Sequence, residues 1–449
     1  MYLKKSAVYA VSLSLVGFIS ACGVSGNDGT DSVSGGLNNL VKATVIDDIN
    51  ASTMLQVIHT KIDSNATNAF GYKAVKISYK TVGQDDKPLV ASGLLVIPTA
   101  TAQYQQYRLS QGKKPFSVSM LCNNHGTIFK DTEAPSNVEL LNGSYPQAVL
   151  MTGYAGFAAI YPDYIGFGDS NTTVHPYILK KAAAREAVDM LKASMTYMKN
   201  NNVVLNYQLY ISGYSEGGYN ALAMAEEVEK NFSDKVNLMG VAPMAGPYNV
   251  EALADVDLNA TQPMAYPAFL ADLAYSYTHY YNDVNLSDIA IPSLAQFQLA
   301  FSGQYDTVPI HIILGMGAVD AQGNITDYGF YTHATNELFK DSFISDYQNN
   351  QNNIMRQKFA ENTLDNSTPR SKMNFIQCVD DDIIPFSESN DIYNKFKANG
   401  ADVTLTPIPT GMLSQQKDAT HPFVHVNCVP AAYATAVKWF AAIRNGDIK

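Results

Sequence analysis

Short apolar segments alternate with helical segments along most of this chain, and this alternation restricts the fold more than any other feature. The expected strands are residues 116–122, 157–161, 208–212, 236–243, 374–379 and 402–406, and the expected helices are residues 181–198, 217–230, 388–398 and 431–443. Consecutive parallel strands need a long crossover connection, which is usually a helix. The sequence therefore predicts an α/β protein with a mostly parallel central sheet and helices on both faces.

Two parts of the chain depart from this alternation. Residues 75–80 and 91–98 predict an antiparallel pair of strands before the parallel part. Residues 247–370 are rich in Tyr and Ala and contain no strong strand, and helices are expected there at residues 266–279, 289–301 and 328–341. A gap of this length is too long for an ordinary crossover, so we expect an inserted helical cap or lid; two or three crossover helices are the alternative. The main domain then comprises residues 41–246 and 371–449.

The first residues have the pattern of a bacterial lipoprotein signal. Lys4 and Lys5 precede an apolar run, residues 6–19, which is too short to span a bilayer as a helix. Small residues lead directly to Cys22, as in a lipobox, although an ordinary secretory signal with a chance Cys is the alternative. We expect a signal peptide at residues 1–21, a lipidated Cys22, and a Gly/Ser-rich tether at residues 22–40. This pattern predicts a protein of the bacterial cell envelope that is held to the membrane by its lipid anchor only.

Charge and composition exclude several classes of protein. The chain has 30 Lys and Arg against 41 Asp and Glu, for a net charge of −11, so no basic face for nucleic acid is expected. Hydrophobic residues make up 46% of the chain, which is enough for a large core. Four Cys in 449 residues exclude a disulfide-dense scaffold.

The strongest chemical motif is Gly213-Tyr214-Ser215-Glu216-Gly217-Gly218. It follows an expected strand and precedes an expected helix, which is the setting of a nucleophile elbow. Small residues must stand two positions on either side of the nucleophile because the turn is tight, and here both are Gly. The motif predicts that Ser215 is a nucleophile at the carboxyl edge of the sheet.

A serine nucleophile needs a base and an acid, which follow it along the chain in this architecture. Asp381 stands after the strand at residues 374–379 and four residues before Pro385, and we predict it as the acid, with its neighbours Asp380 and Asp382 as alternatives. The predicted base is His425, five residues before Pro430, where we expect the last helix to begin. His421 is the alternative base.

The oxyanion hole needs backbone N–H groups. One is expected from Glu216, which follows the nucleophile, and the other from Thr127 in the loop His125-Gly126-Thr127 after the strand at residues 116–122. His125 is expected to be structural. Neither a metal nor a cofactor is expected in this site.

The motifs GYSEGG, HGT, PDYIGFGDS, DDDIIP and HVNCVPAAYATAVKWF together resemble the α/β-hydrolases, and most closely the secretory lipase family. The resemblance covers roughly residues 70–445. It implies a Ser215–Asp381–His425 triad, a helical cap over the pocket, and hydrolysis of carboxylic esters without a cofactor. The sequence departs from the family at Glu216, where relatives often carry Gln, and at Cys378, where Gly is common.

Two further Cys lie beside the predicted acid and base. Cys378 precedes Asp381 and Cys428 follows His425, and the loops that carry the triad must meet. A Cys378–Cys428 disulfide is therefore expected in an exported protein, with two buried free thiols as the alternative. Cys122 would remain unpaired.

These features favour a lipase or carboxylesterase that acts on small-molecule or lipid esters through an acyl-enzyme. An esterase restricted to short acyl chains, a serine peptidase on the same fold, and a non-catalytic surface lipoprotein remain as alternatives.

Overall fold

A nine-stranded sheet forms the centre of the computed structural model, which describes residues 39–138, 145–260, 262–418 and 421–448. The strand order is β1-β2-β3-β5-β4-β6-β7-β10-β11. The strands are β1 Leu40–Ile49, β2 Gly71–Val82, β3 Pro88–Thr99, β4 Val118–Asn124, β5 Ala158–Pro162, β6 Leu205–Tyr214, β7 Asn237–Met244, β10 Met373–Cys378 and β11 Val403–Ile408. The predicted signal peptide, Cys22 and the predicted tether up to residue 38 lie outside the described residues.

The pairing of the strands confirms the predicted mostly parallel sheet. From β5 to β11, every neighbouring pair is parallel. The pairs β1–β2, β2–β3 and β3–β5 are antiparallel, which includes the predicted pair of early strands. The carboxyl ends of the parallel strands therefore meet at one edge of the sheet, where β4, β6 and β10 end in the loops that carry the predicted site.

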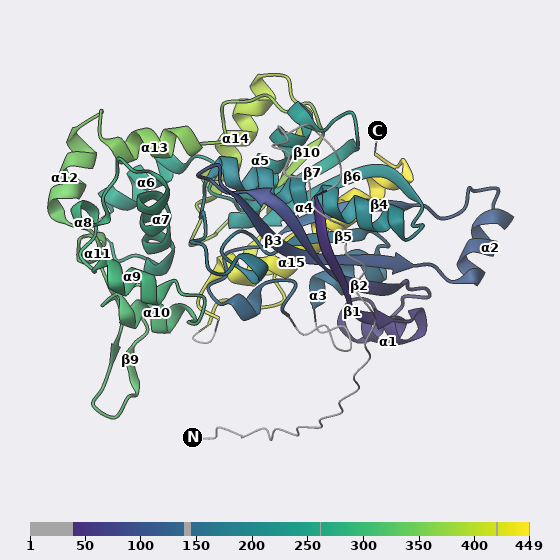
Figure 1. Ribbon diagram of the computed structural model, residues 1–449, viewed down its shortest axis with the longest axis horizontal. Coiled ribbons are helices and arrows are strands. Elements are labelled where there is room, and N and C mark those ends of the chain that lie inside the picture. Colours follow the sequence, from purple (N-terminus) through teal and green to yellow (C-terminus); the bar gives the residue numbers. More distant parts are fainter. Residues whose placement is uncertain (1–38, 139–144, 261, 419–420, 449) are drawn as a thin grey trace, which may run out of the picture. The chain divides into compact units, whose positions relative to one another are not determined.

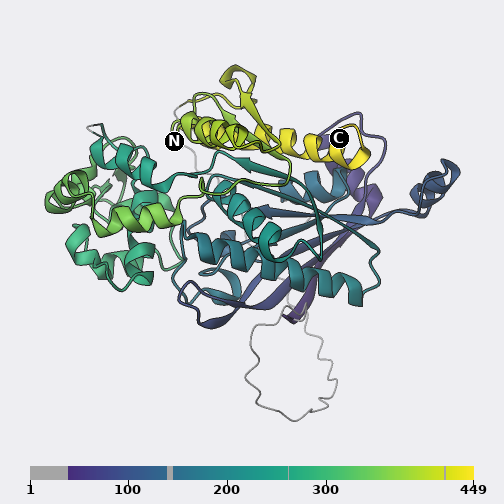
Figure 2. The same ribbon diagram turned by 90° about the horizontal axis from the view of Figure 1, so that it is seen from above.

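Helices cover both faces of the sheet. The main-domain helices are α1 Ala51–Lys61, α2 Ala102–Ser110, α3 Pro146–Ala148, α4 Lys180–Asn200, α5 Glu216–Asn231, α14 Phe386–Ala398 and α15 Val424–Asn445. α4 and α5 lie on one side of the sheet and α15 on the other (Figure 2). Alternate residues of each strand face the two layers: Leu209 and Ile211 of β6 join the core with α4 and α5, and Tyr210 and Tyr214 join the core with α15.

The segment between β7 and β10 is a helical insertion, which we define as residues 247–370. Its helices form a separate group beside the carboxyl edge of the sheet (Figure 1). Among its described residues, the elements are α6 Val250–Asn259, α7 Pro267–Tyr280, α8 Leu286–Ile289, α9 Leu294–Ala300, α10 Thr307–Ile313, β8 Ala318–Val319, β9 Ile325–Asp327, α11 Thr335–Leu338, α12 Asp341–Asn349 and α13 Ile354–Asn362. None of the helices that the structure describes, here or in the main domain, is long and apolar enough to cross a membrane.

Three local predictions are wrong. The helix expected at residues 328–341 is a loop up to the short α11, because Gly329 and Tyr331 both take positive φ angles that end regular structure. The tether does not extend to residue 40, since Leu40 already pairs with Tyr79 in the sheet. The last helix does not begin at Pro430: α15 starts at Val424 and contains the proline.

The position of Pro430 inside α15 has a simple physical basis. A proline in a helix removes the N–H that would bond the carbonyl four residues earlier, here that of Val426. The Val426 side chain is exposed, so water can reach this part of the helix. His425 therefore lies in the first turn of α15 rather than in a loop.

A disulfide joins Cys378, the last residue of β10, to Cys428 in α15. Cys122 is a buried free cysteine, and burial raises the pKa of its thiol. The disulfide thus fastens the strand before the predicted acid to the helix that carries the predicted base.

We expect the loss of this disulfide to lower the free energy of unfolding by about 2–4 kcal/mol, because the bridge restricts the unfolded chain across a separation of 50 residues. The measurement is urea unfolding of the wild-type protein, with and without reductant. The Cys378→Ala/Cys428→Ala variant is the control, since reductant should not change it further. A thiol count on the denatured, unreduced protein that finds Cys378 and Cys428 reactive would contradict the bridge.

Candidate active site

Ser215 occupies a sharp turn between β6 and α5. Its backbone has φ 60° and ψ −125°, an unfavourable conformation for a residue other than Gly, and its N–H donates to the carbonyl oxygen of Met244 in β7 at 2.9 Å. A Cβ atom on Gly213 would lie 2.0 Å from the carbonyl oxygen of Gly217, and one on Gly217 would lie 2.1 Å from that of Asn124. Gly213 and Gly217 are therefore both required for this turn to form.

Asp381 and His425 form a buried pair. His425 Nδ1 lies 2.7 Å from Asp381 Oδ2, and the two side chains are 5% and 0% exposed. The backbone N–H groups of Ile383 and Ile384 donate to Asp381 Oδ1 at 3.1 and 3.0 Å, and Gln377 Nε2 donates to Oδ2 at 3.3 Å. These donors hold the carboxylate in place, so it can fix the orientation of the imidazole.

The alternative acid and base residues do not make this contact. Asp382 accepts hydrogen bonds from the backbone N–H of His425 and from Lys417 Nζ, and Asp380 accepts one from the Thr410 hydroxyl. His421 is half exposed and lies 3.2 Å from Asp418. Of the residues proposed from the sequence as acid and base, the structure brings together Asp381 and His425.

Ser215 and His425 line one cavity of about 230 Å³ together with Thr127. His425 Nε2 is buried and has no hydrogen-bond partner among the described residues, and no hydrogen bond joins it to Ser215. Catalytic hydrogen bonds are often long in a free enzyme and shorten when substrate binds. This arrangement leaves the Nε2 atom available to a group that enters the cavity.

The loop after β4 packs against the nucleophile turn. A Cβ atom on Gly126 would lie 3.7 Å from that of Ser215, and the Thr127 hydroxyl is 3.0 Å from the Tyr177 hydroxyl. Within the described residues, neither the Thr127 N–H nor the Glu216 N–H donates a hydrogen bond. These two N–H groups therefore have no intramolecular acceptor that would compete with an oxyanion.

His125 is the first residue of this loop, and its contacts are structural. Its Nδ1 atom is 2.7 Å from the carbonyl oxygen of Gly126, and its Nε2 atom is 3.3 Å from that of Asp163. Burial lowers the pKa of the imidazole. The Asp163 carboxylate accepts hydrogen bonds from Ser92 and Ser136, which joins two loops of the main domain to strand β3.

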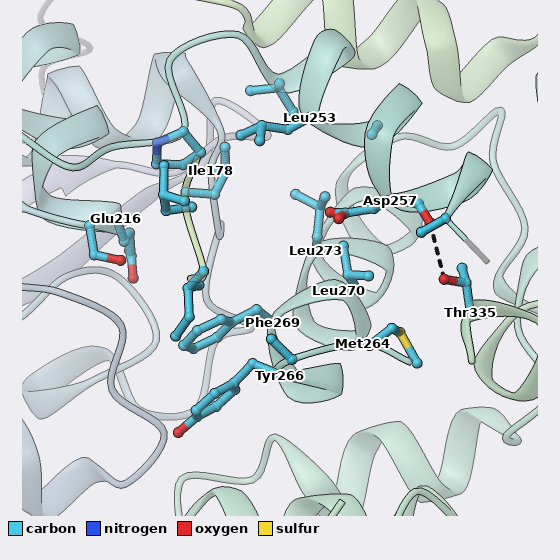
Figure 3. A pocket seen from close by; sticks show the side chains of 18 of the residues that line it. Ile178, Glu216, Leu253, Asp257, Met264, Tyr266, Phe269, Leu270, Leu273 and Thr335 are labelled. Carbon is cyan, nitrogen blue, oxygen red and sulfur yellow. Dashed lines mark hydrogen bonds between the residues drawn. The ribbon is translucent and has the colours of Figure 1, made fainter. Parts of the chain in front are cut away.

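A second cavity, of about 210 Å³, extends from Ser215 and Glu216 into the helical insertion (Figure 3). We call it the insertion cavity. Its walls are mostly apolar side chains from α6, α7 and the segments that flank them, and it also reaches Ile383 and Ile384 beside the acid. Neither this cavity nor the first one contains a group of His, Cys, Asp and Glu residues that could hold a metal ion, among the residues that the structure describes.

His175 is a site residue that the sequence analysis did not identify. Its Nε2 atom lies 2.9 Å from Glu216 Oε1, its Nδ1 atom lies 2.8 Å from the carbonyl oxygen of Ile165, and both side chains of the pair are buried. Burial lowers the pKa of the imidazole, but the Glu216 carboxylate, together with Asp272 and the Ile165 carbonyl, more than offsets burial, and the resulting pKa is about 9. The sequence feature that could have indicated such a residue is Glu216 itself, because a buried carboxylate next to the nucleophile needs a cationic partner.

Two more buried acids lie near this pair. Burial raises the pKa of Glu186 to about 8, although its carboxylate accepts a hydrogen bond from the Ile165 N–H at 2.7 Å. Burial also raises the pKa of Asp272 to about 7. Glu216, Glu186 and Asp272 therefore surround one imidazole, and three of these four groups hold a proton more tightly than in the unfolded chain.

These pKa values predict that the folded protein loses stability as the pH rises from 6.5 to about 9. His175, Glu186 and Asp272 keep protons in the folded state at pH values where the unfolded chain has released them, so the stabilisation is largest at low pH and is lost as each group titrates. We expect the free energy of unfolding to fall by an amount on the order of 1–3 kcal/mol across this range. Urea unfolding at several pH values measures it.

The His175→Gln variant is the control for this prediction. Without the imidazole, the stability of the protein should depend less steeply on pH between 6.5 and 9. A wild-type stability that is constant or rises across this range would contradict the assigned protonation of the cluster.

Comparison with known proteins identifies the fold. No family model and no curated protein matches the sequence. A presumed hydrolase from Legionella pneumophila has a similar structure, with a TM-score of 0.73, 21% identity, and coverage of 92% of this chain and 100% of the other. The rice cell wall degrading esterase LipA from Xanthomonas oryzae matches with a TM-score of 0.70 and 20% identity over 90% of this chain and 97% of its own. Candida antarctica lipase A matches with a TM-score of 0.55 and 12% identity over 89% and 82%.

The similar structures and the strand order of this chain indicate the same fold. The chain has the α/β-hydrolase fold.

Proposed function

We propose that this protein is a serine hydrolase that cleaves carboxylic esters, a lipase or carboxylesterase of the secretory lipase type. The observation that carries the proposal is the Asp381–His425 pair, whose His425 lines the same cavity as a strained Ser215 and has a buried Nε2 atom without a hydrogen-bond partner among the described residues. A protein that used this fold only for binding would not need a base whose outer nitrogen is buried and without a partner. The names of the similar proteins from Xanthomonas oryzae and Candida antarctica, an esterase and a lipase, also support it.

The mechanism follows from the positions of these groups. His425 Nε2 accepts the proton of the Ser215 hydroxyl while the oxygen attacks the ester carbonyl, and the N–H groups of Thr127 and Glu216 bind the oxyanion. The C–O bond to the alcohol then breaks, and the alcohol leaves with the proton from His425. Water attacks the acyl-enzyme in the same way and releases the acid. Asp381 orients the imidazole and stabilises its charged form throughout.

Ser215→Ala should reduce the hydrolysis of p-nitrophenyl esters by at least about 10⁴-fold while the protein stays folded, because it removes the nucleophile. A fluorophosphonate probe should label Ser215 in the wild-type protein and label nothing in the variant. His425→Ala should lose activity to a similar extent. The matched control is His421→Ala, which should retain most activity because His421 lies outside the site.

The outcomes separate the alternatives. No labelling of Ser215 would favour a non-catalytic binding protein, and turnover of dipeptide amides in preference to esters would favour a peptidase. A series of p-nitrophenyl esters from acetate to palmitate distinguishes a lipase from an esterase, since a lipase should prefer the long chains that the apolar insertion cavity can hold.

We also propose that the protein is anchored in the bacterial cell envelope by acyl chains on Cys22. The supporting observation is the sequence of residues 1–22, in which small residues join a short apolar run to the cysteine.

The Cys22→Ser variant should therefore lose membrane attachment, because the thiol that would receive the lipid is absent. Fractionation of cells into membrane and soluble parts measures this, with the detergent phase of a Triton X-114 extraction as a second readout. Cys122→Ser is the matched control and should remain with the membrane. An equal membrane fraction for wild type and Cys22→Ser would refute the anchor.

A further inference from the structure

One face of α6 forms part of the wall of the insertion cavity. Val250, Leu253, Ala254 and Asp257 follow one another at helical spacing, and all four line the cavity. The first three are apolar, as expected for a helix face that borders an apolar space. Asp257 places a carboxylate where this pattern predicts another apolar side chain.

Neither a hydrogen bond, an ion pair nor the helix dipole explains the carboxylate of Asp257 at this position. No hydrogen bond or ion pair to its carboxylate occurs among the described residues; its backbone carbonyl accepts hydrogen bonds from the Thr335 hydroxyl at 3.0 Å and from the Ala260 N–H at 3.3 Å. It lies in the last turn of α6, where the helix dipole disfavours a negative charge. Burial raises the pKa of the carboxyl to about 6, with no nearby charge to offset it. Within the part of the chain that the structure describes, no group therefore pairs with this carboxylate.

Figure 3 shows the Asp257 carboxylate turned into the cavity, on the side away from Glu216. Leu270 and Leu273 of α7 lie near it, and all three residues line the cavity (Figure 3). Glu216 is the other charged residue in the cavity wall that the structure describes, and its charge is matched by His175. A ligand that extended from Ser215 through the cavity would therefore meet one charged group that has no partner among the described residues, on the side away from Glu216.

Ser215 lines both cavities, so each cavity would hold one part of a bound ester. The leaving alcohol must lie beside His425 to receive its proton, and His425 lines the first cavity but not the insertion cavity. The acyl chain would then occupy the insertion cavity, whose wall is mostly apolar. Its distal end then reaches Asp257.

We propose that Asp257 is a specificity residue that accepts a hydrogen bond from a hydroxyl group on the distal part of the acyl chain. The preferred substrates are then esters of hydroxylated aliphatic acids. This inference rests on the proposed ester hydrolysis. A hydroxyl fits the site better than an ammonium group, because a charged group would lose more hydration along the apolar wall before it reached the carboxylate.

The test compares methyl laurate with a set of methyl hydroxylaurates that carry the hydroxyl at successive carbons from the middle of the chain to its end. The measured quantity is the ratio of kcat/KM for each hydroxylated ester to that for methyl laurate. For at least one position, we expect this ratio to fall by roughly tenfold or more in Asp257→Leu, because a hydrogen bond to a charged group is lost. Asp257→Leu should also raise kcat/KM for methyl laurate, whose chain no longer meets a carboxylate.

Two further variants make the comparison specific. Asp257→Asn, which keeps an oxygen acceptor without the charge, should give an intermediate ratio. Asp255→Asn is the matched control on the same helix, since Asp255 pairs with Arg356 and does not line the cavity. Its ratio should equal that of the wild-type protein. Ratios that are the same in wild type and Asp257→Leu for every hydroxyl position would overturn the proposal, as would a preference for an ω-amino ester over every hydroxylated one.

Binding to Ser215→Ala separates this proposal from the proposed reaction. Thermal shifts of that variant with the same esters do not depend on turnover, so the hydroxylated ester should stabilise Ser215→Ala more than it stabilises Ser215→Ala/Asp257→Leu. If the wild-type protein hydrolyses no ester but this difference is present, the proposed reaction fails and the binding role of Asp257 stands. If esters are hydrolysed and this difference is absent, the role of Asp257 fails alone.

Discussion

Close contact between backbones at the turn after β6 is the constraint on which the rest of the site depends. Gly213 and Gly217 allow this turn to lie directly against the end of β4, at distances that no side chain would permit. The same contact brings the loop of Gly126 and Thr127 next to Ser215. The nucleophile and both candidate oxyanion donors are thus positioned by backbone packing, and little depends on flexible side chains.

The second constraint is the charge balance around Glu216. Its N–H group is a candidate oxyanion donor, but its own carboxylate would oppose negative charge that develops nearby. His175 removes this conflict, because the imidazole stays protonated beside the carboxylate and makes the pair neutral. Glu216 directly follows the nucleophile, so a Glu at this position is compatible with the chemistry of the site only when the cation accompanies it.

Features that depend on neighbouring residues could be predicted from the sequence, whereas features that depend on residues far apart in the chain could not. The sheet, the strand–turn–helix around Ser215, and the candidates Asp381 and His425 depend on local patterns and chain order, which a sequence displays. His175 and Asp257 depend on residues far away in the chain, and no local pattern marks them. The helix expected at residues 328–341 had apolar residues at suitable spacing, but positive φ angles at Gly329 and Tyr331 end regular structure there.

The helical insertion shapes the larger part of the apolar cavity beside the nucleophile turn. The groups placed at the carboxyl edge of the sheet, Ser215, His425 and Thr127, would treat any ester carbonyl alike. Among the described residues, the insertion supplies most of the apolar wall of the insertion cavity, and in our proposal its Asp257 carboxylate meets the distal part of the acyl chain. A hydrophobic pocket separates chains of different length weakly, whereas an unmatched buried polar group strongly disfavours a ligand that cannot pair with it. Selectivity in this protein should therefore come from one polar contact in the insertion more than from the size of the cavity.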